Sequence, residues 1–231
     1  MDNLCVIPAR GGSKRIPRKN IKNFLGKPII AYSIDAALSS GLFDEVMVST
    51  DDEEIAEIAM RYGAKVPFLR SAENSSDYAT TLDVLKEVIS YYNKQQVSFQ
   101  NVACIYPCAP FVTAKNLQDS FEIKNRKGFH TVFPVIEYSF PIQRSLTLNG
   151  GRIKFAYPEF SQTRSQDLEK HYHDAGQYYV LDVYETILKN RLLTENSGAV
   201  VISELEGQDI DNETDWRLAE LKYQILTDEI S

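Results

Sequence analysis

The chain has 231 residues, of which 43% are hydrophobic and 25% are charged, and this composition is typical of a globular protein. Its formal net charge of −7 argues against nucleic acid as the main partner, and no apolar run approaches the ~20 residues that a membrane helix needs. We expect no signal peptide, and three cysteines without a framework spacing favour a reducing, cytoplasmic location.

The first half of the chain alternates short apolar runs with amphipathic segments. Residues 4–7 form an apolar run that Pro8 ends, which predicts a buried strand, and an apolar helical pattern runs from Pro28 to Gly41. In the next predicted helix, Asp51 and Asp52 are interpreted as capping residues and not as metal ligands. Further strands are expected at 46–48, 102–106 and 131–136, and further helices at 50–63, 82–92 and 114–123.

This alternation of predicted strands and helices is interrupted at about residues 138–175. Alternating apolar positions flank Asn149-Gly150-Gly151, which predicts a β-hairpin in an extension of the sheet. Strands return at 177–181 and 199–202, and a closing helix begins at about Thr214. Strands that alternate with helices predict an α/β fold with a Rossmann-like, mostly parallel twisted sheet flanked by helices. We therefore expect a single domain over 1–231 with an inserted arm at 138–175.

A basic, glycine-rich segment follows the first predicted strand, where residues 7–20 read IPARGGSKRIPRKN. In open α/β sheets, ligands bind beyond the carboxyl ends of the strands. The pair Gly11-Gly12 allows backbone N–H groups to turn toward a phosphate. We therefore predict an anion site instead of a solvated basic loop, although the segment matches neither the Walker A nor the GxGxxG motif. Between Asp2 and Asp35 there is no acidic residue, and seven cations occur there: Arg10, Lys14, Arg15, Arg18, Lys19, Lys22 and Lys27.

The string ARGGSKRIPRKN resembles the signature ARxGSKGxxxKN of the cytidylyltransferases that activate nine-carbon acidic sugars, the CMP-sialate synthetase family. Five further stretches resemble family motifs in the same order: STDDEEIAEIAMRYGAKV, LRSAENSSDYATTLDVL, IYPCAPFVTAKNL, TRSQDLEKHYHDAGQYYV and GQDIDNETDW. Three departures look like the branch that uses pseudaminic acid. Arg15 stands where the signature has Gly, Tyr106 where CMP-sialate synthetases have Gln, and Ala175-Gly176-Gln177 where they have Asn-Gly-Ala.

The resemblance implies an enzyme that transfers CMP from CTP to the anomeric hydroxyl of the sugar and releases pyrophosphate. Arg10, Lys14 and Lys19 would be the catalytic cations that neutralise the phosphates, with Lys19 near the α-phosphate. The implied nucleotide site comprises Pro8, Ala9, Arg10, Gly12, Ser13, Lys14, Lys19, Asn20, Arg70 and Thr81. The expected sugar site comprises Tyr106, Gln143, Arg144, Arg164, Gln166, Tyr172 and Gln177.

Asp209 and Asp211 are the expected ligands of a magnesium ion. Their period-two spacing places both carboxylates on one side of an extended segment, and Mg²⁺ prefers oxygen ligands. The alternative is that they form a capping cluster before the helix at Thr214. The metal role is preferred because the family motif falls on the same residues.

The arm at 138–175 is expected to form a homodimer, because it carries exposed-looking aromatic residues and related synthetases use this region to dimerise and to complete the neighbour's sugar pocket. Two other classes of protein remain open. One is a metal-dependent glycosyltransferase, since Asp209-Ile210-Asp211 is a DxD string, and the other is a noncatalytic nucleotide-binding regulator. Pseudaminic acid is the expected sugar, because of the resemblance to that branch, and legionaminic and N-acetylneuraminic acids are the alternatives.

Overall fold

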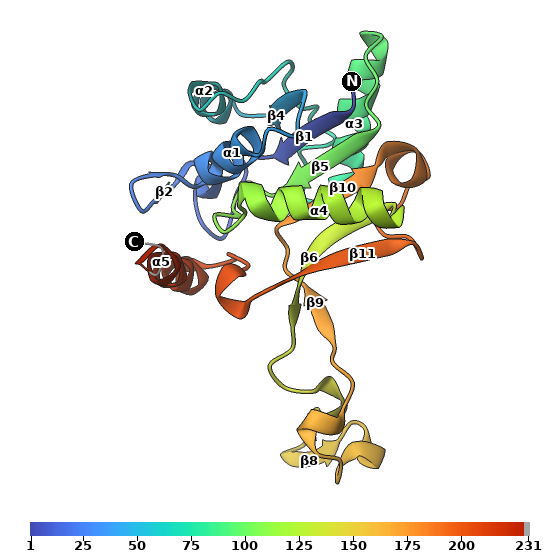
Figure 1. Cartoon of the computed structure of the whole chain (residues 1–231). Coiled ribbons are helices and arrows are strands. Elements are labelled where there is room, and N and C mark those ends of the chain that lie inside the picture. The colour runs from blue at the N-terminus through green and yellow to red at the C-terminus, as the bar shows by residue number, and fades with distance from the viewer. Residues whose placement is uncertain (229–231) are drawn as a thin grey trace.

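A twisted sheet runs through the centre of the computed structural model, which describes residues 1–228 (Figure 1). Its strands lie in the order β11-β6-β10-β5-β1-β4, and β9 pairs with the carboxyl end of β6. These strands are β1 (Asn3–Pro8), β4 (Glu45–Ser49), β5 (Asn101–Ile105), β6 (Thr131–Glu137), β9 (Tyr172–Asp174), β10 (Tyr178–Asp182) and β11 (Ser197–Ile202). A small ribbon of β2 (Asn23–Phe24) and β3 (Lys27–Pro28) lies outside this sheet.

All the helices expected from the sequence are present, and local signals set their ends. Asp52 caps α2 by accepting a hydrogen bond from the Ile55 N–H at 3.0 Å, as predicted, and Thr80 and Thr113 begin α3 and α4 with capping boxes. Gly41 ends α1 in the left-handed conformation, with φ of 67°. The helices are α1 (Ile29–Ser40), α2 (Glu53–Arg61), α3 (Thr81–Lys94), α4 (Ala114–Lys127) and α5 (Glu213–Asp228).

Helices cover both faces of the sheet. Alternate residues of a strand point to opposite faces, and in β1 Cys5 and Ile7 pack with α1, α2 and α4, whereas Leu4 and Val6 pack with α3. Since both faces of β1 are buried, its sequence is a continuous apolar run instead of an alternating one. Within residues 1–228, no helix is both long and apolar enough to cross a membrane.

The C-terminal helix α5 packs away from these two cores. Trp216 and Ala219 of α5 are buried in a third cluster with Phe24, Ile16 and Ile210. Ile16 belongs to the basic loop, and burying a large apolar side chain stabilises a fold by about 1.5–3 kcal/mol. This cluster therefore holds α5 and the segment before it against the basic loop.

Most of the sheet is parallel, but β10 is not. β1 pairs in parallel with β4 and β5, and β6 with β11, whereas β10 runs antiparallel to both β5 and β6. No crossover helix lies between β6 and β10. The chain leaves β6 into the arm and returns through β9, which is antiparallel to β6, so β10 enters the sheet from the opposite end.

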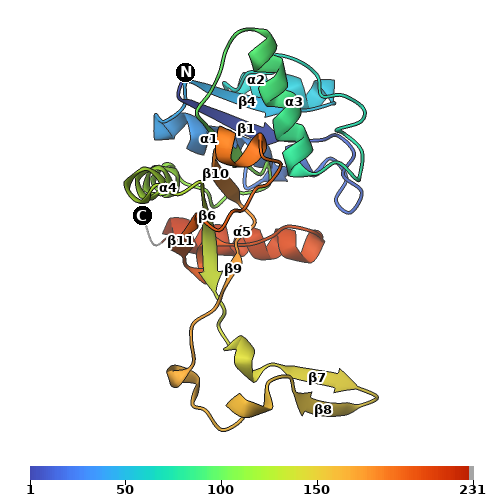
Figure 2. The ribbon, with the colours of Figure 1, turned by 90° about the vertical axis from the view of Figure 1, so that its right-hand side faces the viewer.

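The insert at 138–175 projects from the sheet as an arm (Figures 1 and 2). Its stalk is the end of β6 paired with β9, and its far end carries the hairpin of β7 (Leu146–Asn149) and β8 (Arg152–Phe155). Gly150 and Gly151 form the turn with φ of 55° and 77°, values that favour glycine. The predicted hairpin is therefore confirmed.

Candidate functional site

A cavity of about 530 Å³ opens at the carboxyl end of β1, where the sequence predicted an anion site. Four segments line it: the basic loop, the turn after β5, the turn before β10 and the stretch before α5. β1 and β5 are parallel neighbours, so the turns that follow them lie at the same edge of the sheet. Six of the ten predicted nucleotide residues line the cavity, namely Pro8, Arg10, Ser13, Lys14, Lys19 and Asn20.

Hydrogen bonds from neighbouring segments hold the basic loop in shape. The Gly11 N–H donates to Asp51 Oδ1 at 2.9 Å, and the Asn20 side-chain amide donates to the Arg10 carbonyl at 2.9 Å. Asn20 in turn accepts a hydrogen bond from the Cys108 thiol at 3.2 Å. Burial raises the pKa of Cys108 to about 12, so the thiol stays protonated at neutral pH. The Gly11 N–H, which was expected to turn toward a phosphate, is instead engaged by the Asp51 carboxylate.

Acidic residues from other segments compensate the cations of the basic segment. Asp77 accepts hydrogen bonds from Lys14 Nζ at 2.5 Å and from Arg10 Nη1 at 2.8 Å. These two bonds, that of Lys14 foremost, hold the pKa of Asp77 below its ordinary value. The sequence shows no acidic residue near these cations, and the fold supplies them. The other ion pairs are Arg15 with Asp211, Arg18 with Asp52 and Glu54, Lys22 with Glu213, and Lys27 with Asp35.

Lys19 differs from the other six cations, because within residues 1–228 it pairs with no carboxylate. Its ammonium donates to the Ile210 carbonyl at 2.7 Å and lies in the wall of the cavity. An ammonium has three N–H donors, and this bond uses one of them. Lys19 therefore links the basic loop to the segment before α5 and still offers positive charge to the cavity.

The two predicted metal ligands occupy different environments. Asp209 lines the cavity, and burial, followed by the charge of Asp211, raises the pKa of the Asp209 carboxyl. The Asp211 carboxylate instead pairs with Arg15 at 2.7 Å. The capping alternative is not borne out, because Asn212 Oδ1 accepts the hydrogen bond from the Thr214 N–H at 2.8 Å and caps α5 in their place.

The donor set suits a weakly held magnesium ion better than a dedicated metal cage. Within residues 1–228, no cluster of three or more histidine, cysteine, aspartate or glutamate side chains is arranged to hold a metal. Mg²⁺ commonly takes one or two carboxylates and completes its shell with water and substrate phosphates. Asp209, which lines the cavity and whose carboxyl pKa is raised by burial and by the neighbouring charge of Asp211, fits that role.

The remaining predicted nucleotide residues do not belong to the lining of the cavity. Ala9 is fully buried, and its N–H donates to the Ser49 carbonyl at 2.9 Å. Arg70 is also buried and donates to the carbonyl and hydroxyl of Ser49, so its guanidinium holds the end of β4. The hydroxyl of Thr81 lies 3.1 Å from that of Tyr106. Together with Gly12, these residues do not line the cavity, and their contacts with a nucleotide stay a prediction.

Two predicted sugar residues lie in or next to the cavity. Tyr106 lines it and stacks edge-to-face against Tyr179. Burial raises the pKa of Tyr106 to about 12. Gln177 is buried, and its amide donates to the Glu206 carbonyl at 2.5 Å, so it shapes the wall next to Gly176.

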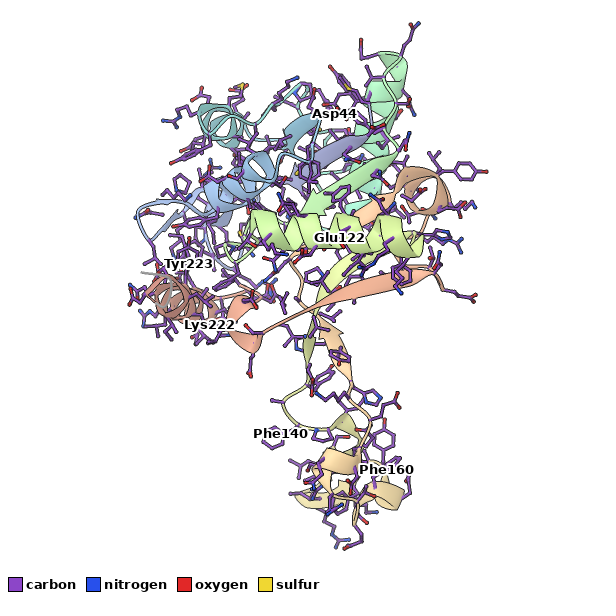
Figure 3. The ribbon with its side chains drawn as sticks, in the orientation of Figure 1. Asp44, Glu122, Phe140, Phe160, Lys222 and Tyr223 are labelled. Carbon is purple, nitrogen blue, oxygen red and sulfur yellow. The ribbon has the colours of Figure 1, made fainter. Side chains whose placement is uncertain are left out.

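The other five predicted sugar residues lie in the arm. Arg164 pairs with Asp167 on the arm surface at 2.8 Å, and Arg144 donates to Ser165 at 3.2 Å. Figure 3 labels Phe140 and Phe160 in the arm, and Lys222 and Tyr223 on α5. None of the five predicted sugar residues of the arm lines the cavity of its own chain. They are Gln143, Arg144, Arg164, Gln166 and Tyr172.

A second cavity of about 410 Å³ adjoins the first, since Gln208 and Asp209 line both. It lies between the base of the arm and α5, with His173 and Asp174 on one side and Lys222 on the other. Sequence reasoning did not single out this cavity. It also missed six residues of the first cavity as site residues, although all of them stand within two positions of a predicted one. They are Arg15, Pro107, Cys108, Gly176, Gln208 and Ile210.

Comparison with known proteins agrees with this geometry. The model of the family described as cytidylyltransferase matches residues 4–201. A pseudaminic acid cytidylyltransferase from Campylobacter jejuni is 42% identical over 228 residues, which make up 97% of each chain. A CMP-N,N'-diacetyllegionaminic acid synthase from Legionella pneumophila is 33% identical over 226 residues, 94% of each chain. The solved structure of a CMP:2-keto-3-deoxy-manno-octonic acid synthetase complexed with CTP has the same fold, with a TM-score of 0.68 at 16% sequence identity. The match covers 99% of this chain and 100% of that chain.

Proposed function

Because this chain belongs to the cytidylyltransferase family, we propose that it transfers CMP from CTP to the anomeric hydroxyl of a nonulosonic acid, with release of pyrophosphate. Pseudaminic acid is the proposed sugar, ahead of legionaminic and N-acetylneuraminic acids. The observation that carries the proposal is the cavity of about 530 Å³ at the end of β1, which is lined by Arg10, Lys14 and Lys19 together with Asp209. A DxD glycosyltransferase would not require this basic loop.

The cations of the loop stabilise the charge that develops during transfer. The sugar hydroxyl attacks the α-phosphorus in line, and pyrophosphate leaves on the opposite side. Arg10 forks onto phosphate oxygens, and the point charges of Lys14 and Lys19 neutralise the triphosphate. Lys19 is held by the Ile210 carbonyl, so its ammonium is already oriented before the substrate binds.

Asp209 is the residue that would hold Mg²⁺, whereas Oδ1 of Asp211 is engaged by Arg15 and Asp211 does not line the cavity. When bound, the ion would neutralise phosphate charge next to the lysines. Asp209 fits this role because it lines the cavity and, within residues 1–228, forms no ion pair with a lysine or arginine. The two carboxylates therefore contribute unequally, and Asp209 is the more important of them.

The sugar is proposed to lie toward the second cavity, beyond Tyr106 and Gly176. That cavity adjoins the nucleotide site at Gln208 and Asp209, which line both, and Lys222 supplies positive charge there. Tyr106 lines the first cavity and Gln177 is buried next to Gly176 in its wall, and these are the residues expected to select the sugar.

The arm is proposed to act on a second copy of the chain in a homodimer. Arg144 and Arg164 belong to the arm and do not line the cavity of their own chain, so we expect them to contact a sugar that is bound by a partner. The hairpin also exposes apolar side chains such as Leu148, which is 72% exposed, and Ile153, which is 64% exposed. Association would cover them.

A turnover panel tests the reaction. The chain is incubated with CTP, Mg²⁺ and each of the three nonulosonic acids, and pyrophosphate release is measured. We expect the highest kcat/KM with pseudaminic acid. CTP binding without release of pyrophosphate in the presence of any of the three sugars would instead identify a nucleotide-binding regulator.

The three cysteines are free thiols, which agrees with the proposed cytoplasmic location.

Mixing two variants of reduced activity tests the arm. A Lys19→Met chain lacks a loop cation, and an Arg164→Ala chain lacks an arm cation. If Arg164 acts on the partner, a mixed dimer contains one cavity with both residues intact, and mixing restores part of the activity. Light scattering should give twice the chain mass of 26.2 kDa. A fully active monomer would rule out this role of the arm.

A further inference from the structure

The carboxylate of Asp77 pairs with two of the cations that are proposed to bind the nucleotide, Arg10 and Lys14. Asp77 Oδ1 accepts from Arg10 Nη1 at 2.8 Å, and Asp77 Oδ2 accepts from Lys14 Nζ at 2.5 Å. Arg10 also donates to the Ser76 carbonyl at 3.2 Å. The two oxygens of this carboxylate each bind one cation, as two oxygens of a phosphate group can.

The segment that carries Asp77 is held in place by other contacts. It connects Arg70 to α3, and Glu87 of α3 accepts hydrogen bonds from the Ser71 N–H at 3.0 Å and from the Asn74 side-chain amide at 2.9 Å. The Asp77 side chain is 44% exposed, and its hydrogen bonds within residues 1–228 go to Arg10 and Lys14. Asp77 can therefore release both cations while its segment stays anchored by Glu87.

The charges favour such an exchange. Arg10 and Lys14 together carry two positive charges, and Asp77 supplies one negative charge, so the group retains a net positive charge. A nucleoside triphosphate carries several negative charges at neutral pH and offers more acceptor oxygens than one carboxylate. Since Asp77 keeps its charge at neutral pH, an incoming triphosphate competes with it for the same donors.

We infer that Asp77 is an internal counter-anion, which holds Arg10 and Lys14 at the edge of the empty nucleotide site and is displaced by the triphosphate of the nucleotide. This inference rests on the proposed function, in that it assigns the cavity to CTP. Asp77 thereby lowers the affinity for CTP and for the pyrophosphate product, and it keeps the two cations from binding smaller anions.

The experiment compares CTP binding to the wild-type chain and to Asp77→Asn by isothermal titration calorimetry. An exposed ion pair contributes little, so the loss of two is expected to tighten CTP binding about 2- to 25-fold. Binding of inorganic pyrophosphate should tighten in the same direction. Cytidine has no phosphate, and its affinity should stay unchanged.

Glu213→Gln is the matched control. It causes the same change in net charge, but Glu213 pairs with Lys22, which does not line the cavity. CTP affinity should therefore change little in Glu213→Gln. Asp77→Ser is a second variant that also removes the charge, and a thermal melt of each variant checks that the chain is folded.

The outcomes separate this inference from the proposed function. If the wild-type chain binds CTP and both Asp77 variants bind it equally or more weakly, Asp77 positions the cations instead of competing for them, and the inference is overturned. Equal tightening in Glu213→Gln would also overturn it, since the effect would then come from net charge. If the wild-type chain does not bind CTP, the proposed function itself fails.

Discussion

Replacing Gly11 by Ala should destabilise the fold, although Gly11 lies in an exposed loop at the edge of the cavity. A Cβ at this position would lie 2.6 Å from Asp52 Oδ2 and 3.0 Å from Asp52 Cβ. Asp52 cannot simply rotate away, because its Cβ is also too close. Its carboxylate caps α2 and receives two hydrogen bonds from Arg18. The substitution must therefore disturb the cap, the ion pair or the loop.

The expected cost follows from these contacts. Loss of an N-cap usually costs ~1 kcal/mol, and a partly exposed ion pair contributes at most about 1 kcal/mol more. Gly11→Ala should therefore lower the free energy of unfolding by about 1–2 kcal/mol. For a chain of this size, this corresponds to a fall in Tm of about 2–8 °C.

The neighbouring glycine provides the control. A Cβ built on Gly12 meets no atom within 4 Å, so Gly12→Ala should leave Tm almost unchanged. Both variants are compared with the wild-type chain by calorimetry at pH 7 without nucleotide. Equal Tm values for Gly11→Ala and Gly12→Ala would show that the close approach of Asp52 to the loop does not exist in solution.

Three further changes test other contacts. Asp52→Asn keeps an N-cap oxygen but removes the charge. Arg18 holds the pKa of Asp52 below its ordinary value of 3.8, so the ionised carboxylate stabilises the fold above that pH and this contribution is lost as the pH falls through the folded-state pKa. Urea unfolding should show the variant less stable at pH 7, with the difference shrinking below pH 3.8, and a constant difference would contradict the reasoning. Lys19→Met removes the ammonium bound to Ile210. It should lower kcat/KM for CTP by about 10- to 150-fold, because a charge-assisted contact contributes about 1.5–3 kcal/mol. Lys19→Arg keeps the positive charge and should retain part of the activity. Arg164→Ala should raise KM for the sugar by about 10- to 100-fold and leave KM for CTP nearly unchanged. A loss of CTP affinity instead would contradict the assignment of Arg164 to the sugar site.

The order and type of the elements could be read from the chain because the signals are local. The apolar run before Pro8, the cap at Asp52 and the turn at Gly150-Gly151 each act within a few residues of themselves. The direction of β10 could not be read in the same way. Its apolar run is the same whichever way the strand points, and only the path of the arm decides that it returns antiparallel.

The sequence by itself determined that a basic, glycine-rich loop follows the first strand, and this order alone places Arg10, Lys14 and Lys19 at the carboxyl edge of the sheet. Only the tertiary structure decided what these cations contact. Asp77 lies more than sixty positions from both Arg10 and Lys14, and Ile210 lies 191 positions from Lys19. Patterns along a chain report the periodicity of one element, whereas ion pairs between segments depend on the order in which strands join the sheet. For that reason a segment that seems to have uncompensated positive charge becomes, in the folded chain, a site where Arg10 and Lys14 already pair with a carboxylate and Lys19 is held by a backbone carbonyl.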